Sequence, residues 1–227
     1  MESLELLANN IANASTGGYK ADREFYSLYV SEEARASDST ATMPVIERPW
    51  IDMAQGEIRN TGNSLDLALS GKGFFAVNGP SGPLYTRNGN FRMDAAGKLV
   101  TSDGNALRGA GGAPIVLQSA RPVDISKDGT VTQDGAVVGQ LEIADFTSAA
   151  GLSKQGSNYF RVTDPSVRSA APGSASVEQG KLEGSNTGSA EAAVRLVSVM
   201  RQFEMLQKAV TMGTDMNRAA IEQVAKV

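Results

Sequence analysis

The sequence of 227 residues contains no cysteine and no histidine. Without these residues it has no disulfides, no thiolate nucleophile and no Ser-His-Asp triad, and nearly every type of structural zinc site is excluded. Lys and Arg total 21 against 25 Asp and Glu, and this net charge of -4 argues against the basic surfaces that bind nucleic acid or anionic lipid. We therefore expect no catalytic residue, no cofactor, no metal ion and no nucleic-acid partner.

Long apolar runs are also absent from the sequence. No segment approaches the roughly 20 apolar residues of a membrane helix, so we expect no membrane insertion. No basic segment followed by an apolar one opens the chain, so we expect that any export proceeds without a cleaved signal peptide. The 41% of hydrophobic residues is enough for a sizeable core in one or two domains.

The middle of the chain has the pattern of an all-β domain. Short apolar or alternating runs between residues 65 and 165 are separated by turn dipeptides. These dipeptides are Asn88-Gly89, Ala96-Gly97, Asp103-Gly104, Asp128-Gly129 and Asp134-Gly135. They are typical of tight hairpins, and their close spacing favours sequential antiparallel strands over parallel units joined by helices.

Both ends of the chain have a helical period. Near the N-terminus, Leu4, Leu7, Ile11 and Ala14 are spaced by three and four residues, and Gly17-Gly18 suits the end of a helix. From Leu196 to Val227 the apolar positions repeat in the same steps over more than four heptads, flanked by four methionines. The predicted fold class is mainly β with α-helical termini, in which an N-terminal helix and a long C-terminal helix pair like a coiled coil beside an antiparallel β domain.

This pattern divides the chain into four parts. The predicted parts are a discontinuous helical assembly domain (1–30 with 187–227), an extended connector (31–64), a β domain (65–165) and a second connector (166–186).

Two enzyme-like interpretations of the sequence are weaker than structural ones. Asp94, Asp103, Asp128 and Asp134 adjoin turn glycines, where an aspartate caps its own backbone. The segment 71–73 (GKG) lacks the remaining residues of a phosphate-binding loop and is better explained as a tight turn into a buried strand. The alternative from another functional class is a secreted enzyme or carbohydrate-binding β module whose helices serve only for dimerisation.

Several motifs carry a resemblance to a known family. The segment NNIANASTGGYK (9–20) resembles the signature NNxANxxTxG[FY]K of bacterial flagellar rod and hook proteins. Four further segments are similar to elements of that family and extend the resemblance over essentially the whole chain: GEIRNTGNSLDLAL (56–69), GFFAV (73–77), YTRNGNF (85–91) and GKLV (97–100). RQFEM (201–205) is similar to proximal-rod members, whereas distal-rod members usually read closer to QRAYE; a distal-rod or other rod and hook protein remains the near alternative.

The resemblance implies a non-enzymatic, structural subunit of the flagellar basal-body rod, the periplasmic axial tube that transmits torque and conducts exported proteins. It implies self-assembly through the terminal helices, export by the flagellar type III apparatus, and other rod subunits, distal-rod subunits among them, as partners. The asparagines of the signature are expected to form hydrogen bonds where subunits meet. The predicted assembly-interface residues are Leu4, Leu7, Asn9, Asn10, Ile11, Asn13, Thr16, Gly18, Tyr19, Leu196, Val199, Phe203, Leu206 and Val210.

Overall fold

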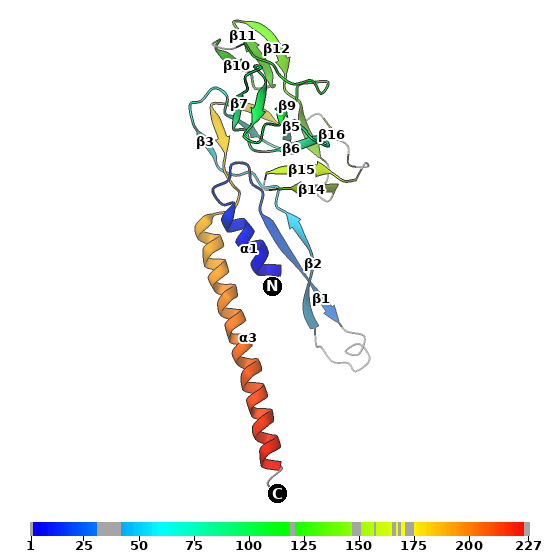
Figure 1. Cartoon of the computed structure of the whole chain (residues 1–227), viewed down its shortest axis with the longest axis vertical. Coiled ribbons are helices and arrows are strands. Elements are labelled where there is room, and N and C mark those ends of the chain that lie inside the picture. The colour runs from blue at the N-terminus through cyan, green and yellow to red at the C-terminus, as the bar shows by residue number, and fades with distance from the viewer. Residues whose placement is uncertain are drawn as a thin grey trace.

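The computed structural model describes residues 2–30, 42–118, 121–146, 151–156, 158–164, 167, 169–170 and 175–224. The molecule is elongated (Figure 1). Most strands gather at one end, and two helices and a two-stranded ribbon extend away from them on the same side. Helical termini and a β-rich middle are thus confirmed.

The two helices differ greatly in length. α1 spans Glu2–Ala12 and α3 spans Ser189–Val224, which is 36 residues. At 1.5 Å per residue, α3 is about 54 Å long and α1 only about 17 Å. α1 packs against the beginning of α3, as Figure 1 shows, so among the described residues no other helix lies beside most of α3. Coiled-coil geometry between the two helices stays a prediction, and Val227, the last position of the predicted pattern, lies outside the described residues.

A two-stranded antiparallel ribbon leaves the β-rich end alongside the helices. β1 (Asp22–Val30) pairs with β2 (Thr42–Ile51), and the register shifts between Phe25 and Tyr26. The residues of β1 fall in the predicted helical assembly domain (1–30), and those of β2 fall in the first predicted connector (31–64). β1 carries the run FYSLYV, and its aromatic and β-branched residues favour extended structure over helix.

The β domain is built from antiparallel pairings. Its main strands are β4 (Leu67–Ser70), β5 (Phe74–Gly79), β6 (Gly82–Thr86), β7 (Phe91–Met93), β8 (Leu99–Thr101), β9 (Ala106–Leu107), β13 (Ile143–Phe146), β14 (Leu152–Gln155), β15 (Tyr159–Val162) and β16 (Ser169–Ala170). The largest sheet has the order β14-β15-β6-β5-β9-β8-β7, and β13 pairs with both β5 and β16. The fully buried Phe75, Val77 and Leu107 lie in the centre of its hydrophobic core.

Three more strands form a small sheet at the end of the molecule farthest from α3 (Figure 1). They are β10 (Val123–Ile125), β11 (Thr130–Gln133) and β12 (Ala136–Gln140). β11 and β12 are joined by Asp134-Gly135, with φ angles of 50° and 79°. This left-handed pair is the tight hairpin that the sequence predicted.

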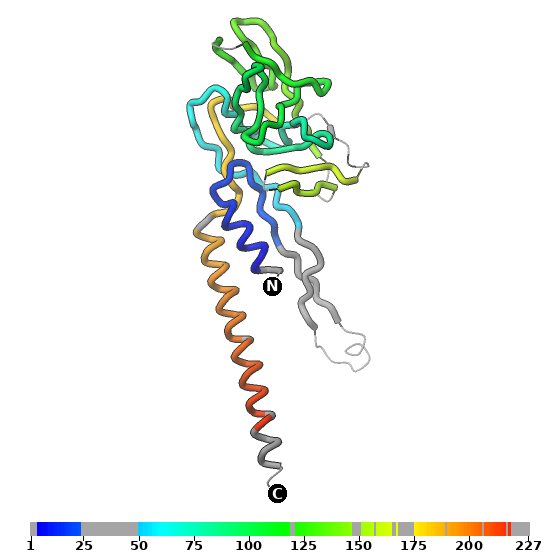
Figure 2. Tube along the Cα trace, in the orientation of Figure 1, coloured from blue at the N-terminus to red at the C-terminus, as the bar shows by residue number. Residues whose placement is uncertain are grey.

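The second predicted connector also contains strands. β17 (Ser176–Gln179) pairs with β4, and β18 (Lys181–Glu183) pairs with β3 (Ile58–Asn60). Figure 2 shows the consequence: the N-terminal segment and the segment before α3 meet at the base of the β domain. Connections that looked irregular in the sequence therefore bring the N-terminal segment and the segment that enters α3 together.

Candidate functional site: the junction of helices and β domain

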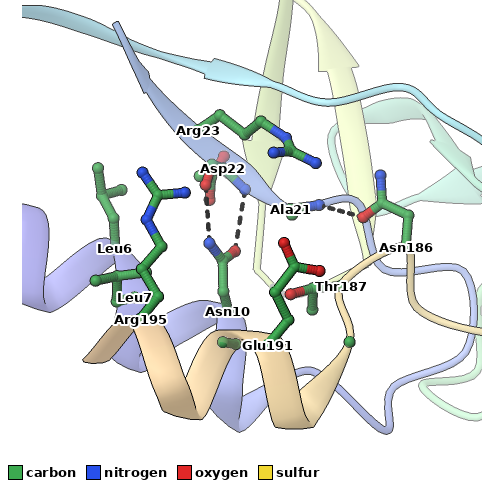
Figure 3. Close-up of a pocket in the computed structure, with 12 residues that line it drawn as sticks. Leu6, Leu7, Asn10, Ala21, Asp22, Arg23, Asn186, Thr187, Glu191 and Arg195 are labelled. Carbon is green, nitrogen blue, oxygen red and sulfur yellow. Dashed lines mark hydrogen bonds between the residues drawn. The ribbon is translucent and has the colours of Figure 1, made fainter. Parts of the chain in front are cut away.

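Asn10 fixes α1 to the start of β1. Its side-chain Nδ2 donates to the carbonyl oxygen of Asp22 at 2.8 Å, and its Oδ1 accepts the Asp22 N–H at 3.0 Å (Figure 3). The Tyr19 hydroxyl donates to the same Oδ1 at 3.0 Å. Asn10 is 6% exposed, so a residue that weakens a helix is retained where its amide satisfies buried backbone groups.

The other two signature asparagines form a small network on the same side. Asn13 Nδ2 donates to the carbonyl oxygen and to Oδ1 of Asn9, both at 2.9 Å. The Tyr19 hydroxyl donates to Asn9 Oδ1 at 3.1 Å, and Thr16 Oγ1 donates to Asn13 Oδ1 at 3.3 Å. The asparagines thus have partners within their own chain, and their expected role between subunits stays a prediction.

Gly18 turns the chain into the β domain. Its φ is 68°, and its N–H donates to the carbonyl oxygen of Glu183 at 2.8 Å. A β-carbon at this position would lie 2.3 Å from both the Arg87 carbonyl carbon and the Asn88 nitrogen. Only glycine satisfies both the conformation and the close approach.

Three charged side chains form what we call the junction cluster: Lys20, Arg87 and Glu183. Lys20 Nζ lies 2.6 Å from Glu183 Oε1, and Arg87 Nη1 lies 3.1 Å from Glu183 Oε2. The Gly56 N–H donates to Glu183 Oε1 at 2.9 Å. The side chains of Lys20 and Glu183 are fully buried and that of Arg87 is 4% exposed. One carboxylate therefore joins three separate segments of the chain.

The cations of the junction cluster have further acceptors. Lys20 Nζ donates to the Ala54 carbonyl oxygen at 2.7 Å. Arg87 donates to the carbonyl oxygens of Leu69 at 3.2 Å and Gly71 at 2.5 Å. Burial lowers the pKa values of both cations, and Glu183 opposes this effect. Such buried charges are tolerated only when paired and hydrogen-bonded. Both cations meet this condition through these contacts, although Arg87 Nε is buried without a hydrogen-bond partner among the described residues.

Asn186 attaches the start of α3 to neighbouring backbone groups, as Asn10 attaches α1. Its Oδ1 accepts the Ala21 N–H at 2.7 Å (Figure 3), and its Nδ2 donates to the Asp52 carbonyl oxygen at 2.7 Å. The Asn186 N–H also donates to the Tyr19 carbonyl oxygen at 3.2 Å. The segment that enters α3 is therefore tied to the residues that precede β1.

Lys154 of β14 contacts the segment that leads into β1. Its Nζ lies 2.6 Å from Asp22 Oδ2, donates to the Lys20 carbonyl oxygen at 2.7 Å, and stands 4.5 Å from the centre of the Tyr19 ring. Burial lowers the pKa of Lys154, opposed by Asp22. Burial, with Asp22, raises the pKa of Tyr19, so this phenol stays protonated at neutral pH.

α1, β1 and the start of α3 enclose a small cavity of about 50 Å³. In Figure 3, Leu6 and Leu7 line it from α1, and Glu191 and Arg195 line it from α3. Of the predicted interface residues, Leu7 is 6% exposed here. Leu7 therefore contributes to the packing of α1 within the chain.

Two regions of the chain match flagellar family models. Residues 68–133 match the flagellar hook protein FlgE/F/G D1 domain, and residues 178–223 match the flagellar basal body rod FlgEFG protein C-terminal region. The basal-body rod protein FlgF of Caulobacter vibrioides is 30% identical over 99% of this chain and 92% of its own length. The chain belongs to the flagellar basal-body rod protein family. Proteins of this family are structural and are not enzymes.

FlgG proteins are similar to this rod protein to the same degree. FlgG of Agrobacterium fabrum is 33% identical over 94% of this chain and 90% of its own length. FlgG of Bacillus subtilis is 33% identical over 92% of this chain and 88% of its own length. Arg87 lies in the D1 match and Glu183 in the C-terminal match, so the junction cluster links both matched regions to the N-terminal segment.

Two of the four aspartates that adjoin turn glycines in this rod protein, Asp94 and Asp128, hold their own turns, whereas the carboxylate of Asp103 accepts the Tyr159 hydroxyl and that of Asp134 pairs with Arg121. Asp94 Oδ1 accepts the N–H groups of Ala96 at 2.9 Å and Lys98 at 2.8 Å. Asp128 accepts the N–H and the hydroxyl of Thr130. In the part of the chain that the structure describes, no three acidic side chains gather as metal ligands would.

The predicted interface on α3 is partly covered. Leu196 and Val199 are half-buried, whereas Phe203 is 42% exposed and Val210 is 67% exposed. The side chain of Leu206 lies outside the described set. On α1, Leu4 and Ile11 are half-buried. Neither helix has an apolar stretch suited to crossing a membrane, as judged over the described residues.

Neither the junction cluster nor Asn186 is among the residues predicted from the sequence. Lys20 and Arg87 fall inside the family motifs, but Glu183 lies 163 residues after Lys20 and 96 after Arg87. A single sequence carries no signal that these charges meet. Only the pairing of β18 with β3, which itself was not predicted, brings Glu183 to this place.

Proposed function

We propose that this chain is a structural subunit of the flagellar rod that joins its neighbours through α3 and α1. The observation that carries the proposal is the apolar surface of α3, which α1 covers only at its base. Large apolar side chains on α3 are exposed along its length: Val194, Val197, Met200, Phe203, Met205, Val210, Met212 and Met216.

Such a surface has a physical consequence. A helix with apolar side chains on several sides is stable when other elements bury it, and exposed apolar patches of this kind mark protein contacts. Contacts between different patches on successive subunits build a helical tube instead of a closed ring when the rotation does not close. The coiled-coil-like pairing of α1 with α3 belongs to this proposal, with Leu4, Leu7, Ile11, Leu196 and Val199 on the facing sides.

We assign the chain to the proximal-rod type, FlgF, with FlgG as the alternative. Identities of 30% to the Caulobacter FlgF and 33% to two FlgG proteins do not separate the types. The segment RQFEM (201–205) favours FlgF. Complementation distinguishes them: the gene for this chain should restore swimming to a host strain that lacks its FlgF gene and not to one that lacks FlgG.

The partners that follow from this assignment are other rod subunits, FlgG among them. The location is the basal body, in the periplasmic part of the rod, reached through the flagellar type III export apparatus. Support comes from the names of the relatives and from the apolar helix, which needs a neighbour that also presents helices.

The assembly role is tested by charging the exposed face of α3. The double variant Phe203→Asp, Val210→Asp should abolish swimming while the β domain stays folded, because both side chains are exposed in the single chain and neither supports its core. Val137→Asp is the matched control, since Val137 is an equally exposed valine of β12. Normal swimming by the double variant would contradict the proposal.

A further inference from the structure

The N-terminal segment docks between two parts of the chain that lie far away in sequence. The backbone of Gly18 contacts Arg87 on one side and donates a hydrogen bond to Glu183 on the other. Lys20 then enters the buried space between them. The segment is therefore held by the strand end near Arg87 and by the residues that lead into α3.

The order in which this site can close follows from its charges. Arg87 and Lys20 are both buried cations that share one carboxylate, and the positive charge of Arg87 lowers the pKa of Lys20 while Glu183 raises it. A second unpaired cation in a buried site is strongly unfavourable. Lys20 therefore has a stable place beside Arg87 only after the Glu183 carboxylate is already there.

Among the described residues, the hydrophobic core of the β domain takes no buried member from the docked N-terminal segment or from α3. In the described structure, the buried members of both hydrophobic clusters fall between Leu67 and Val177. None of them comes from α1, from the turn at Gly18, or from α3. The β domain can thus keep its packing when the two terminal segments are undocked.

We propose that Glu183 is a positioning residue, which couples the docking of the N-terminal segment to the arrival of the segment that leads into α3. In the undocked state the β domain is folded while α1 and α3 do not lie side by side. In the docked state the junction cluster holds both helices at a fixed place on the β domain. This inference goes beyond the assembly role and does not require it.

Hydrogen exchange on the monomeric full-length chain tests the proposal. The amides of Gly18 and Gly184 report docking, because they donate to Glu183 and Glu57; the amides of Leu67 and Ala76 report the core, because they donate to Gly89 and Glu142. In Lys20→Met, exchange at Gly18 should accelerate by about tenfold or more while Leu67 and Ala76 keep their wild-type rates.

Glu183→Gln should accelerate exchange at both Gly18 and Gly184, because it removes the negative charge that pairs with both cations and replaces one of the two acceptor oxygens by an NH2 donor. Glu178→Gln is the matched control, since Glu178 is a nearby glutamate that pairs with Lys181 at the surface at 2.6 Å. The Glu178→Gln variant should exchange at the wild-type rates at all four amides, those of Gly18, Gly184, Leu67 and Ala76. If Glu183→Gln does not fold, Lys20→Met decides, because it leaves the pairing of Glu183 with Arg87 intact.

Two results would overturn the proposal. The junction would be part of one cooperative core if Gly18 and Leu67 accelerated together in Lys20→Met, and the cluster would have no positioning role if neither changed. Pulse labelling during refolding gives an independent check: Gly18 should gain protection after Leu67 and no earlier than Gly184. Because these measurements use the monomer, a failed motility test would leave their outcome unaffected.

Discussion

Gly18 passes Arg87 so closely that a β-carbon on Gly18 would stand 2.3 Å from the Arg87 carbonyl carbon. The same glycine has a φ of 68° and donates its N–H to Glu183. The two glycines of the N-terminal signature therefore include one whose hydrogen side chain is required by contact as well as by conformation.

Gly18→Ala should destabilise the docked junction more than a conformationally matched substitution does. Gly62 has a φ of 72°, but a β-carbon there would meet no atom within 4 Å. Gly62→Ala should cost about 1 kcal/mol from backbone conformation alone. Gly18→Ala should cost at least about 2 kcal/mol more, because the backbone must also move. Urea unfolding followed at the junction measures the free-energy cost of each substitution. Equal costs would show that the close approach at Gly18 does not contribute to the free energy of unfolding.

Asn10→Ala should loosen α1 from β1, whereas Asn13→Ala should have little effect. Asn10 is buried and its side chain serves both backbone groups of Asp22, so its loss leaves buried groups unpaired at a cost of about 1 to 3 kcal/mol. In the described structure, the Asn13 side chain bonds to Asn9 and Thr16, and its two hydrogen bonds to Asn9 are exposed to solvent. Hydrogen exchange at the Asp22 amide provides the measurement, and similar rates in the two variants would contradict the distinction.

Tyr19 should make the junction sensitive to alkali. Its pKa is raised above the ordinary value of 10.0 by burial and by Asp22. The folded chain then keeps a proton that the unfolded chain has lost, so this contribution to stability is complete below pH 10 and declines as the pH rises further. The decline approaches about 1.4 kcal/mol per pH unit for one group.

The variant Tyr19→Phe distinguishes the loss of stability caused by ionisation of Tyr19 from that caused by other groups. The variant loses hydrogen bonds to Asn9 and Asn10 and should be less stable at neutral pH. Its free energy of unfolding should nevertheless fall less steeply above pH 10 than that of the wild type. Unfolding curves at several alkaline pH values give the slopes, and identical slopes would mean that Tyr19 ionises freely in the folded chain.

Local features of the fold could be predicted from the sequence. Asp134-Gly135 forms the expected hairpin turn, and Asp94 caps its own turn because an aspartate there needs only neighbouring backbone groups. The turn at 71–73 leads into buried Phe74 as expected. Such features depend on residues a few positions apart, so they are visible in a single sequence.

Features that depend on distant residues could not be predicted. The pairing of β18 with β3 involves short, half-exposed strands without a clear alternation, which looked like a connector. β1 was hidden for another reason, because it directly follows a helical signature. β1 and β18 both position the junction. The helices could therefore be predicted from the sequence, but the contacts that attach them to the β domain could not.

Because α3 is long, a small rotation at the junction moves its far end by a large distance. A helix of about 54 Å that is supported only near its base acts as a lever, and a rotation of about 10° at the base would carry its far end about 9 Å sideways. A β-carbon on Gly56 would lie 2.2 Å from the carbonyl oxygen of Gly184, so the close approach of these two glycines affects the direction in which α3 leaves the β domain. If α3 joins a neighbouring subunit as proposed, a clearance of one methyl group at the base of the helix would decide whether its far end meets that neighbour in register.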